Sequence, residues 1–448
     1  MLGSTRTLLG SAVESVVIAA ASASEEHREE MTAVLIVMAG PILLWALCHQ
    51  RLQRLSVTGP LLMVAAGAVV GWFITDETTV FFDSKLALQL AEAILAMLLF
   101  VDAVELRGSL RSHASKIPVR LLAVALPLSL ILIVSVGLAL PLGLSVVAVL
   151  AITCIAVPVD FSPELSIIRD RRIPERVRQW LAVESGYNDG LVTPFLLAAI
   201  ALATTSGDPG DHALAAFGKA APAGIIAVAV GAVVGFATGW LFRQADRRGW
   251  TDTHGTRVGI VALPLFTFAV ALAVHGNGFV AAFVCGVAFR IALAAKSDPD
   301  SHEPPAQFSF AQDIAGLVNL ILWLSFGIVG VIVVVGNFDW WSALFLAAFV
   351  ITIGRIVPVL ISLLGTETDR RDRVFMAVMG PRGVASIVFG LIAYNALPNA
   401  DGEAVLAATC IIVLSSLLLH GLGAPLIIRR LYGATRSTRP DADRHAGE

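Results

Sequence analysis

Apolar residues dominate long stretches of this chain, and these stretches recur from residue 31 almost to the C-terminus. Each covers about 18 residues or more, which is the length that an α-helix needs to cross a bilayer. We therefore predict an all-α polytopic membrane protein with about thirteen transmembrane helices. The expected spans are 31–48, 57–75, 86–106, 117–139, 142–163, 176–205, 213–242, 256–275, 277–295, 311–336, 340–364, 372–397 and 403–430.

Two of the predicted spans contain residues that interrupt a helix. The fifth has Pro158 and Pro163 on either side of Asp160, and the twelfth has Gly-Pro-Arg-Gly at 380–383. Proline removes a backbone donor and breaks a helix, and irregular backbone at membrane depth is tolerated where it lines a buried cavity. Interruptions at matching places in two halves are typical of secondary transporters built from inverted repeats. We therefore expect unwound fifth and twelfth helices and an inverted-repeat fold.

A stripe of glycines, Gly231, Gly235 and Gly239, recurs at every fourth position of the seventh span. Small residues at this spacing let two helices approach closely. The stripe predicts a tightly packed helix pair, and it does not by itself predict a contact between two copies of the chain.

The composition excludes a large soluble domain. Hydrophobic residues make up 57% of the chain and charged residues only 15%, whereas soluble proteins carry roughly a quarter charged residues. The polar stretches between spans are too short to hold an appended catalytic or nucleotide-binding domain. We therefore expect no nucleic-acid or nucleotide partner, and a lipid bilayer as the surroundings of the chain.

The distribution of Lys and Arg predicts the orientation. Most of these residues lie in every second loop and in the C-terminal tail, and loops rich in Lys and Arg stay on the cytoplasmic side of a membrane. We therefore predict that the chain spans the plasma (inner) membrane with its tail in the cytoplasm and its N-terminus on the outer side. We expect three parts: an N-terminal extension or weak signal peptide over 1–30, a transmembrane domain over 31–430, and a short cytoplasmic tail over 431–448.

A small number of polar residues inside the spans carry the candidate chemistry. An ionisable group at mid-bilayer costs about 2.5–3.5 kcal/mol, so each one is a candidate functional residue. In the sixth span, Ser185 and Asp189 lie four positions apart on one helix face, and Glu184 with Asn188 occupies the adjoining face. A carboxylate beside a hydroxyl offers oxygen ligands for a hard monovalent cation. The intramembrane ionisable candidates are Asp102, Asp160, Glu184, Asp189, Arg355 and Arg382.

The sixth-span sequence ESGYNDG, at 184–190, resembles the Glu-Ser-x-x-Asn-Asp signature of the monovalent cation:proton antiporters. The likeness is to the branch that holds NhaP-type Na⁺/H⁺ antiporters and animal Na⁺/H⁺ exchangers. Three further segments resemble motifs of this family: GPRG in the twelfth span, LLFVDAVELRGSLR at the end of the third and ITIGRIVPVLI in the eleventh. The resemblance runs in order over about residues 31–430, and it implies an inverted-repeat antiporter fold.

The resemblance also implies a cation site. By position in the motifs, Asp189 would be the carboxylate that carries the ion and the proton, and Asp160 would be the acid of the unwound fifth helix. Na⁺ would be held by these two acids and Ser185, with the main-chain carbonyl of Val159 as a further ligand. Asp102 would lie near the site and reach the ion through water.

Four other residues take supporting roles, three of them by the same resemblance. Glu184 would form a conformation-holding ion pair with Arg355, which would make a buried acid tolerable. Asn188 would orient its neighbours, and it stands where electrogenic relatives have a second Asp. By its position alone, apart from the resemblance, Arg382 would either orient the site or serve as a helix-terminus partner of the unwound carbonyls.

The predicted function is secondary active exchange of Na⁺, or also Li⁺, for H⁺, with an electroneutral 1:1 stoichiometry. One departure from the family pattern bears on the cation, because Val159, Asp160 and Phe161 stand where relatives usually have Thr-Asp-Pro. The alternative of K⁺/H⁺ exchange at the same site therefore stays open, as does a channel or sensor derivative. We expect no enzymatic activity and no cofactor, and the resemblance implies a homodimer.

Overall fold

The computed structural model describes residues 32, 35–52, 57–73, 85–105, 116–140, 143–164, 167–168, 170–203, 209–294, 308–335 and 340–433. The chain divides into two compact units, Met1–Leu55 and Ser56–Glu448. In the first unit, the helix Leu35–Leu52 is long and apolar enough to cross a membrane. The predicted N-terminal extension over 1–30, and the predicted tail beyond residue 433, lie outside the described residues.

The second unit is helical, and its described residues contain no strand. Its elements are α2 (Gly59–Phe73), α4 (Lys85–Glu105), α5 (Lys116–Arg120), a π-helical turn η2 (Leu121–Ala125), α6 (Leu126–Ala139), α7 (Val146–Ala156), a short 3-10 turn η3 (Ser162–Glu164), α9 (Glu175–Ala203), α10 (Pro209–Arg247), α11 (Thr253–Ala273), α12 (Gly278–Ala294), α13 (Ser309–Val335), α14 (Trp340–Ile351), α15 (Ile353–Ser362), α16 (Arg370–Val378), α17 (Val384–Ala396) and α18 (Asn399–Tyr432).

These helices confirm the predicted class of protein. Each predicted span overlaps one helix or a short series of consecutive helices, and eight helices among the described residues are long and apolar enough to cross a membrane. The chain is therefore a multi-pass, all-α membrane protein, whereas the number thirteen stays a prediction. The helix of the predicted fifth span is shorter than the apolar run 142–163, because α7 ends at Ala156.

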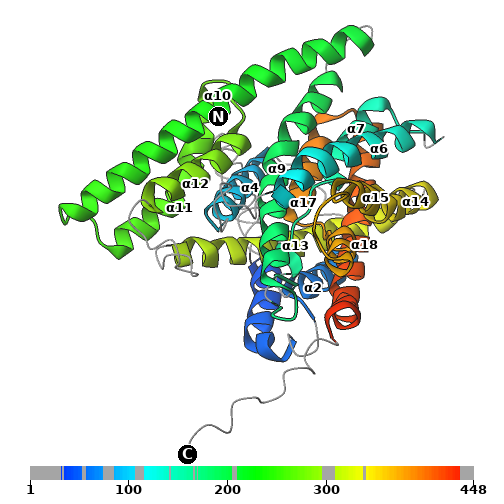
Figure 1. The fold of residues 1–448 in the computed structure, drawn as a ribbon, viewed down its shortest axis with the longest axis horizontal. Helices are drawn as coiled ribbons and strands as arrows, with labels where there is room; N and C mark the ends of the chain where they lie inside the picture. The colour runs from blue at the N-terminus through cyan, green and yellow to red at the C-terminus, as the bar shows by residue number, and fades with distance from the viewer. Residues whose placement is uncertain are drawn as a thin grey trace, which may run out of the picture. The chain divides into compact units, whose positions relative to one another are not determined.

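The helices of the second unit gather into two groups. In one, α12 packs against α4, α10 and α11, and α13 packs along α2. In the other, α18 packs against α7, α14 and α17, while α7 also contacts α9. Figure 1 shows α10, α11 and α12 together on one side and α6, α7, α14, α15 and α18 on the other. Helix α9, which carries most of the predicted site, contacts α10 and α12 as well as α7.

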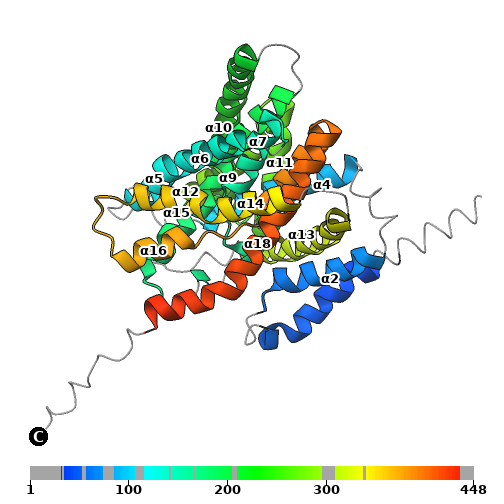
Figure 2. The same ribbon diagram turned by 90° about the vertical axis from the view of Figure 1, so that its right-hand side faces the viewer.

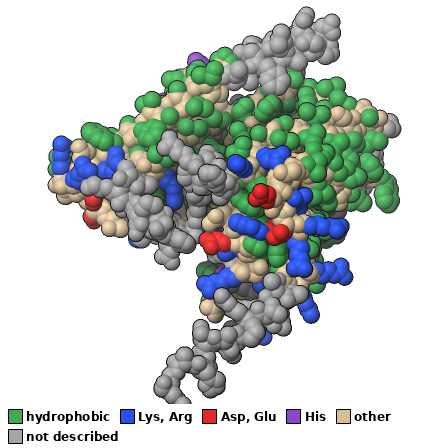
Figure 3. All heavy atoms as spheres, in the orientation of Figure 1, with side chains coloured by type: hydrophobic (Ala, Val, Ile, Leu, Met, Phe, Trp, Pro, Cys, Tyr) green, Lys and Arg blue, Asp and Glu red, His purple; other side chains and the backbone are tan. Residues whose placement is uncertain are grey.

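Apolar side chains cover much of the surface, as expected for a chain in contact with lipid. Large hydrophobic side chains such as Ile131, Phe236 and Leu426 are exposed rather than buried. On the face seen in Figure 3, hydrophobic side chains form a broad area, and Lys and Arg side chains gather mainly below it and at one end. This separation of apolar and basic surface agrees with the alternation of spans and charged loops along the sequence.

The glycine stripe of α10 packs against α12, as its spacing predicted. A Cβ at Gly231 would lie 2.4 Å from the carbonyl oxygen of Ala281, and one at Gly235 would lie 2.5 Å from that of Cys285. The two backbones are therefore in direct contact, and a methyl group at either position has no room.

Substitution of these glycines is expected to separate α10 from α12. We expect Gly235→Ala to lower the free energy of unfolding by roughly 1–3 kcal/mol, because the added methyl group overlaps a backbone carbonyl. Gly224→Ala, on the same helix with nothing within 4 Å of the added Cβ, serves as the control and is expected to be neutral or slightly stabilising. Thermal unfolding of the purified variants measures both, and an unchanged melting temperature for Gly235→Ala would contradict the close packing.

Candidate functional site

The unwound segments of the fifth and twelfth spans cross each other. Residues 157–161, after α7, and residues 379–383, between α16 and α17, are non-helical, as the sequence predicted. The backbone N–H of Asp160 donates to the carbonyl of Pro381 at 2.9 Å. Two interruptions more than two hundred residues apart in the chain therefore form one irregular region inside the helical bundle.

The crossing leaves no space for a side chain at residue 383 while Asp160 keeps its present position. A Cβ at Gly383 would lie 1.9 Å from Oδ2 of Asp160. The same carboxylate oxygen accepts a hydrogen bond from the backbone N–H of Val384 at 3.2 Å. Asp160 thus satisfies one of the free N–H groups at the start of α17, where a negative charge is favourable.

Ser162 provides the remaining contacts of this acid. Oδ1 of Asp160 accepts from the backbone N–H of Ser162 at 2.7 Å, and Oδ2 accepts from its hydroxyl at 2.8 Å. A carboxylate has about four acceptor positions. With three hydrogen bonds made to the protein, Asp160 keeps about one position for a further donor or a cation.

Asp189 lies on α9 and is buried, with 4% of the residue exposed. Its Oδ1 has no hydrogen-bond partner in the protein. Three charged groups act on it electrostatically: the carboxylates of Asp160 and Asp102 and the guanidinium of Arg382. Burying a carboxylate oxygen without a partner costs free energy, and binding a proton or a cation to this oxygen would remove that cost.

Two polar neighbours of Asp189 on α9 contact the unwound fifth segment. Nδ2 of Asn188 donates to the carbonyl of Val159 at 3.0 Å, and the hydroxyl of Ser185 accepts from the N–H of Phe161 at 3.4 Å. Oδ1 of Asn188 is buried without a partner. The Val159 carbonyl, which the sequence analysis expects to be an ion ligand, thus accepts a hydrogen bond from the Asn188 amide. Asn188 thereby fixes the orientation of this carbonyl.

Asp102 comes from the other group of helices. It lies in the last turns of α4, is partly buried, and acts electrostatically on Asp189. Close by in sequence, the carbonyl of Val104 accepts a hydrogen bond from the guanidinium of Arg290, on α12. The predicted role of Asp102 near the site, through water, stays a prediction.

Glu184 and Arg355 form the ion pair that the sequence analysis expected. Both side chains are less than 10% exposed, and their two charged ends meet through two contacts, one of them 2.9 Å between Nη2 and Oε2. Nη2 also reaches the carbonyls of Met376 and Met379, each at 3.3 Å. Arg355 therefore connects α9 to α16, through the carbonyl of Met376, and to the first residue of the unwound twelfth segment, Met379.

Arg382 lies within the unwound twelfth segment and is buried, with 1% exposed. Its Nη1 donates to the carbonyl of Gly380 at 2.6 Å, and its backbone N–H donates to the hydroxyl of Ser416 at 2.8 Å. Of the two roles considered from the sequence, this geometry favours a partner for the unwound carbonyls. Its guanidinium also acts electrostatically on Asp189.

Three residues of this region were missing from the sequence analysis: Ser162, Ser416 and His420. Ser162 follows Asp160 closely and could have been found as a serine beside an acid in a broken helix. His420 is an ionisable residue inside a predicted span, which is itself a signal. Ser416 is an ordinary serine in an apolar helix, and only the fold shows what it contacts.

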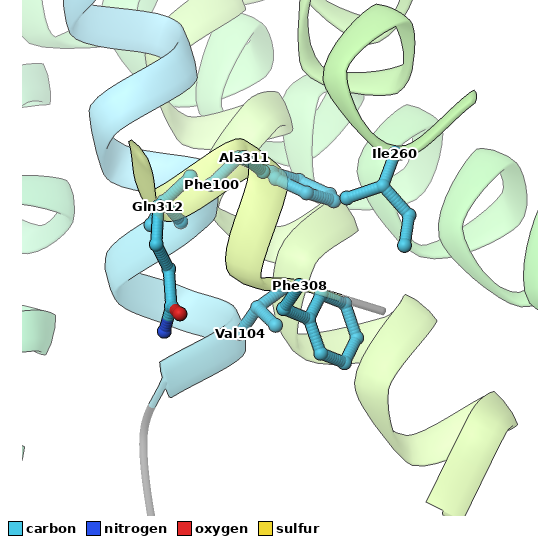
Figure 4. A pocket seen from close by; sticks show the side chains of 7 residues that line it. Phe100, Val104, Ile260, Phe308, Ala311 and Gln312 are labelled. Atoms are coloured by element: carbon cyan, nitrogen blue, oxygen red, sulfur yellow. The ribbon is translucent and has the colours of Figure 1, made fainter. Parts of the chain in front are cut away.

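The acids of the crossing do not form a metal-binding cluster, and they are distinct from the pocket in Figure 4. Among the described residues, no three His, Cys, Asp or Glu side chains are grouped as metal ligands. A small pocket lies between α4, α11 and the start of α13. Its lining is apolar apart from Gln312 and contains no acidic residue.

Breaking the ion pair is expected to destabilise the protein. Arg355→Ala leaves the buried Glu184 without its cation, which costs about 3–5 kcal/mol, whereas replacing both charged partners costs less than the sum of the single changes. The control is Arg172→Ala, because the Arg172–Asp170 pair is at the surface and such a pair contributes about 1 kcal/mol or less. Melting temperatures measure all variants, and an Arg355→Ala protein as stable as wild type would refute the structural role.

Two proteins of Schizosaccharomyces pombe are similar to this chain in sequence. The chain is 26% identical over 287 residues to a probable Na⁺/H⁺ antiporter of Schizosaccharomyces pombe, a match that covers 56% of this chain and 36% of that protein. It is 23% identical over 306 residues to a second Na⁺/H⁺ antiporter of the same organism, covering 61% and 63%. The matches thus span about a third and somewhat under two thirds of the length of these relatives.

Two solved structures of an antiporter from Methanocaldococcus jannaschii are similar in fold to this chain. The structure is similar to that of the sodium proton antiporter MjNhaP1 from Methanocaldococcus jannaschii at pH 8, with a TM-score of 0.68 and 18% identity over 90% of this chain and 100% of that chain. An electron-microscopy structure of the same protein gives a TM-score of 0.65 and 19% identity, covering 92% and 99%. The antiporter fold expected from the sequence is thereby confirmed.

The family model for the transmembrane part of sodium/hydrogen exchangers matches residues 34–430. This range includes the crossing of the two unwound segments and each predicted site residue. The chain belongs to the sodium/hydrogen exchanger family.

Proposed function

We propose that this protein exchanges Na⁺, and also Li⁺, for H⁺ across the membrane. The observation that carries the proposal is the pair of acids beside the crossed segments: Asp160, which keeps about one acceptor position, and Asp189, whose buried Oδ1 has no protein partner. Family membership and the Na⁺/H⁺ antiporter activity given for the fission-yeast relatives support it.

The chemistry of exchange follows from competition for Asp189. A buried carboxylate can be neutralised by a proton or by a monovalent cation, and one site cannot hold both well. The site can change sides of the membrane when Asp189 holds a proton or a cation, but not when Asp189 is empty and charged. Each proton that moves inward therefore requires a cation that moves outward. No cofactor or nucleotide enters this cycle.

We propose an electroneutral 1:1 stoichiometry. Asn188 stands beside Asp189 as a neutral amide, and its Nδ2 hydrogen bond to the Val159 carbonyl gives it a positioning function. Only one of the two neighbouring positions on α9 therefore carries a charge that can exchange. One positive charge would move in each direction per cycle.

K⁺/H⁺ exchange is the second candidate, and one observation favours keeping it. Valine at 159 supplies no hydroxyl, and its carbonyl already accepts from Asn188. Without a threonine hydroxyl, the oxygens available to an ion are those of Asp160, Asp189 and Ser185, together with Oδ1 of Asn188 and the second lone pair of the Val159 carbonyl. With fewer protein oxygens, water would complete the shell, and a partly hydrated site discriminates less between Na⁺ and K⁺.

The proposed setting of this activity is the plasma (inner) membrane. The distribution of Lys and Arg supports an outside N-terminus and a cytoplasmic C-terminus. By likeness to its family, we propose that the protein works as a homodimer.

Removal of the Asp189 charge is expected to abolish exchange. Asp189→Asn keeps the shape of the side chain but cannot bind or release a proton at neutral pH, so no carrier remains. Proteoliposomes with an internal pH dye, given Na⁺, Li⁺ or K⁺, measure cation-driven proton movement. Asp401→Asn is the matched control, since Asp401 accepts from Ser145 near the start of α18, and it is expected to keep exchange.

Each result of this assay supports or refutes one part of the proposal. Exchange retained in Asp189→Asn would refute the assignment of the carrier, and no response of folded wild type to any cation would refute antiport. The order of the three cations decides between Na⁺ and K⁺. A Na⁺ gradient at steady state that follows an imposed membrane potential would contradict the 1:1 stoichiometry.

Asp160 is expected to act on cation affinity. Asp160→Asn replaces one of its acceptor oxygens by a donor that faces the N–H of Val384 or of Ser162, and it removes a charge from the cation site. The apparent KM for the cation should rise by roughly tenfold or more, as expected when a buried charged contact is lost. Ser162→Ala, which removes only the supporting hydroxyl, should raise it less, and an unchanged KM in Asp160→Asn would place Asp160 outside the site.

A further inference from the structure

The unwound twelfth segment has few backbone donors, and each of them needs a partner. Within residues 380–382, Pro381 has no N–H, which leaves those of Gly380 and Arg382. Buried backbone N–H groups outside regular structure must be satisfied by other parts of the protein. In this segment both are satisfied by side chains of α18.

The two α18 side chains lie one helical turn apart. Ser416 Oγ accepts from the N–H of Arg382 at 2.8 Å, and His420 Nε2 accepts from the N–H of Gly380 at 3.3 Å. Both residues are buried, with at most 2% exposed. Residues four apart lie on the same face of a helix, so the two side chains bond two N–H groups of the unwound segment from one face of α18.

The hydrogen bond from Gly380 selects one tautomer of His420. Nε2 accepts the Gly380 N–H only when the ring hydrogen is on Nδ1, which lies 2.9 Å from the carbonyl of Ser416 and 3.2 Å from its hydroxyl. Nε2 is then free to accept from Gly380. In the other tautomer, or in the protonated ring, an Nε2 hydrogen would face the Gly380 N–H and turn instead to the carbonyl of Val378, 3.2 Å away.

The held segment in turn carries two parts of the proposed site. The carbonyl of Pro381 accepts from the N–H of Asp160, and Arg382 projects a guanidinium that acts on Asp189. A shift of the segment would therefore move Asp160 and the Arg382 charge together.

We propose that His420, as the neutral Nδ1–H tautomer, and Ser416 are positioning residues that clamp the unwound twelfth segment and thereby set the geometry of the cation site. Neither touches the ion. This role deepens the proposed function and rests on it, while the clamp itself is a property of the fold. The two can therefore be tested separately.

The variants distinguish the effect of losing a hydrogen-bond acceptor at position 420 from the effect of losing the volume of the ring. His420→Gln can place an amide oxygen toward the Gly380 N–H and an amide hydrogen toward the Val378 carbonyl, whereas His420→Leu keeps volume and removes both. Ser416→Ala removes the acceptor for the Arg382 N–H. Thr409→Val is the matched control, because Thr409 is a buried α18 hydroxyl bonded only within its own helix, to Val405.

The first readout is hydrogen–deuterium exchange of the peptide that covers residues 379–384, which needs no transport activity. We expect His420→Leu and Ser416→Ala to exchange there roughly tenfold faster than wild type, because a buried N–H loses its partner. His420→Gln and Thr409→Val should stay near wild type. Exchange in His420→Leu no faster than in Thr409→Val, or as fast in His420→Gln as in His420→Leu, would overturn the clamp. If His420→Leu does not fold, Ser416→Ala and His420→Gln decide the same question.

The second readout is the apparent KM for the cation in the proteoliposome assay. We expect it to rise roughly tenfold in His420→Leu and Ser416→Ala, with a smaller change in the maximal rate, and to recover in His420→Gln; a misplaced site residue can cost up to about a hundredfold. Faster deuterium exchange with an unchanged KM would overturn the positioning role. Absence of exchange activity in wild type would instead refute the proposed function, and the deuterium measurements would still test the clamp.

Discussion

The backbone hydrogen bond from Asp160 to Pro381 connects the two regions on which this structure depends. A helix that unwinds inside a membrane leaves polar groups that lipid cannot satisfy, and each costs several kcal/mol. Here two unwound segments satisfy part of each other's requirement by crossing. The carboxylate of Asp160 then accepts from the N–H of Val384 at the start of α17, so the acid proposed for the cation site is also a structural element.

Side chains from neighbouring helices supply further partners of the crossing. Helix α9 contributes Asn188 to the fifth segment, and α18 contributes Ser416 and His420 to the twelfth. Arg355 pairs with Glu184 and also donates to the carbonyls of Met376, in α16, and Met379, in the unwound segment. In contrast to these paired groups, two buried oxygens beside the crossing have no hydrogen-bond partner, Oδ1 of Asp189 and Oδ1 of Asn188, and of the two only the Asp189 oxygen belongs to a carboxylate. A site for a small cation or a proton is consistent with that contrast.

Most of the fold could be predicted from the sequence, because lipid imposes simple conditions on it. A segment that crosses a bilayer must be apolar, about 18 or more residues long and helical, so the spans of α9 or α18 are visible as apolar runs. The interruptions at Pro158 and at Gly380–Pro381 are visible for the same reason, since proline cannot continue a helix. The ion pair of Glu184 with Arg355 came from resemblance and not from periodicity, because nothing local joins two residues so far apart.

What the sequence determined by itself was therefore the class of protein, the position of its helices and the short set of acids that could carry an ion. Only the tertiary structure decided how these parts meet: that Gly383 is in contact with Asp160, that the Val159 carbonyl accepts from Asn188, and that His420 holds Gly380. The physical reason is that apolarity and helix breaking are properties of neighbouring residues. The satisfaction of a buried polar group depends instead on which distant side chain the packing brings within hydrogen-bond distance.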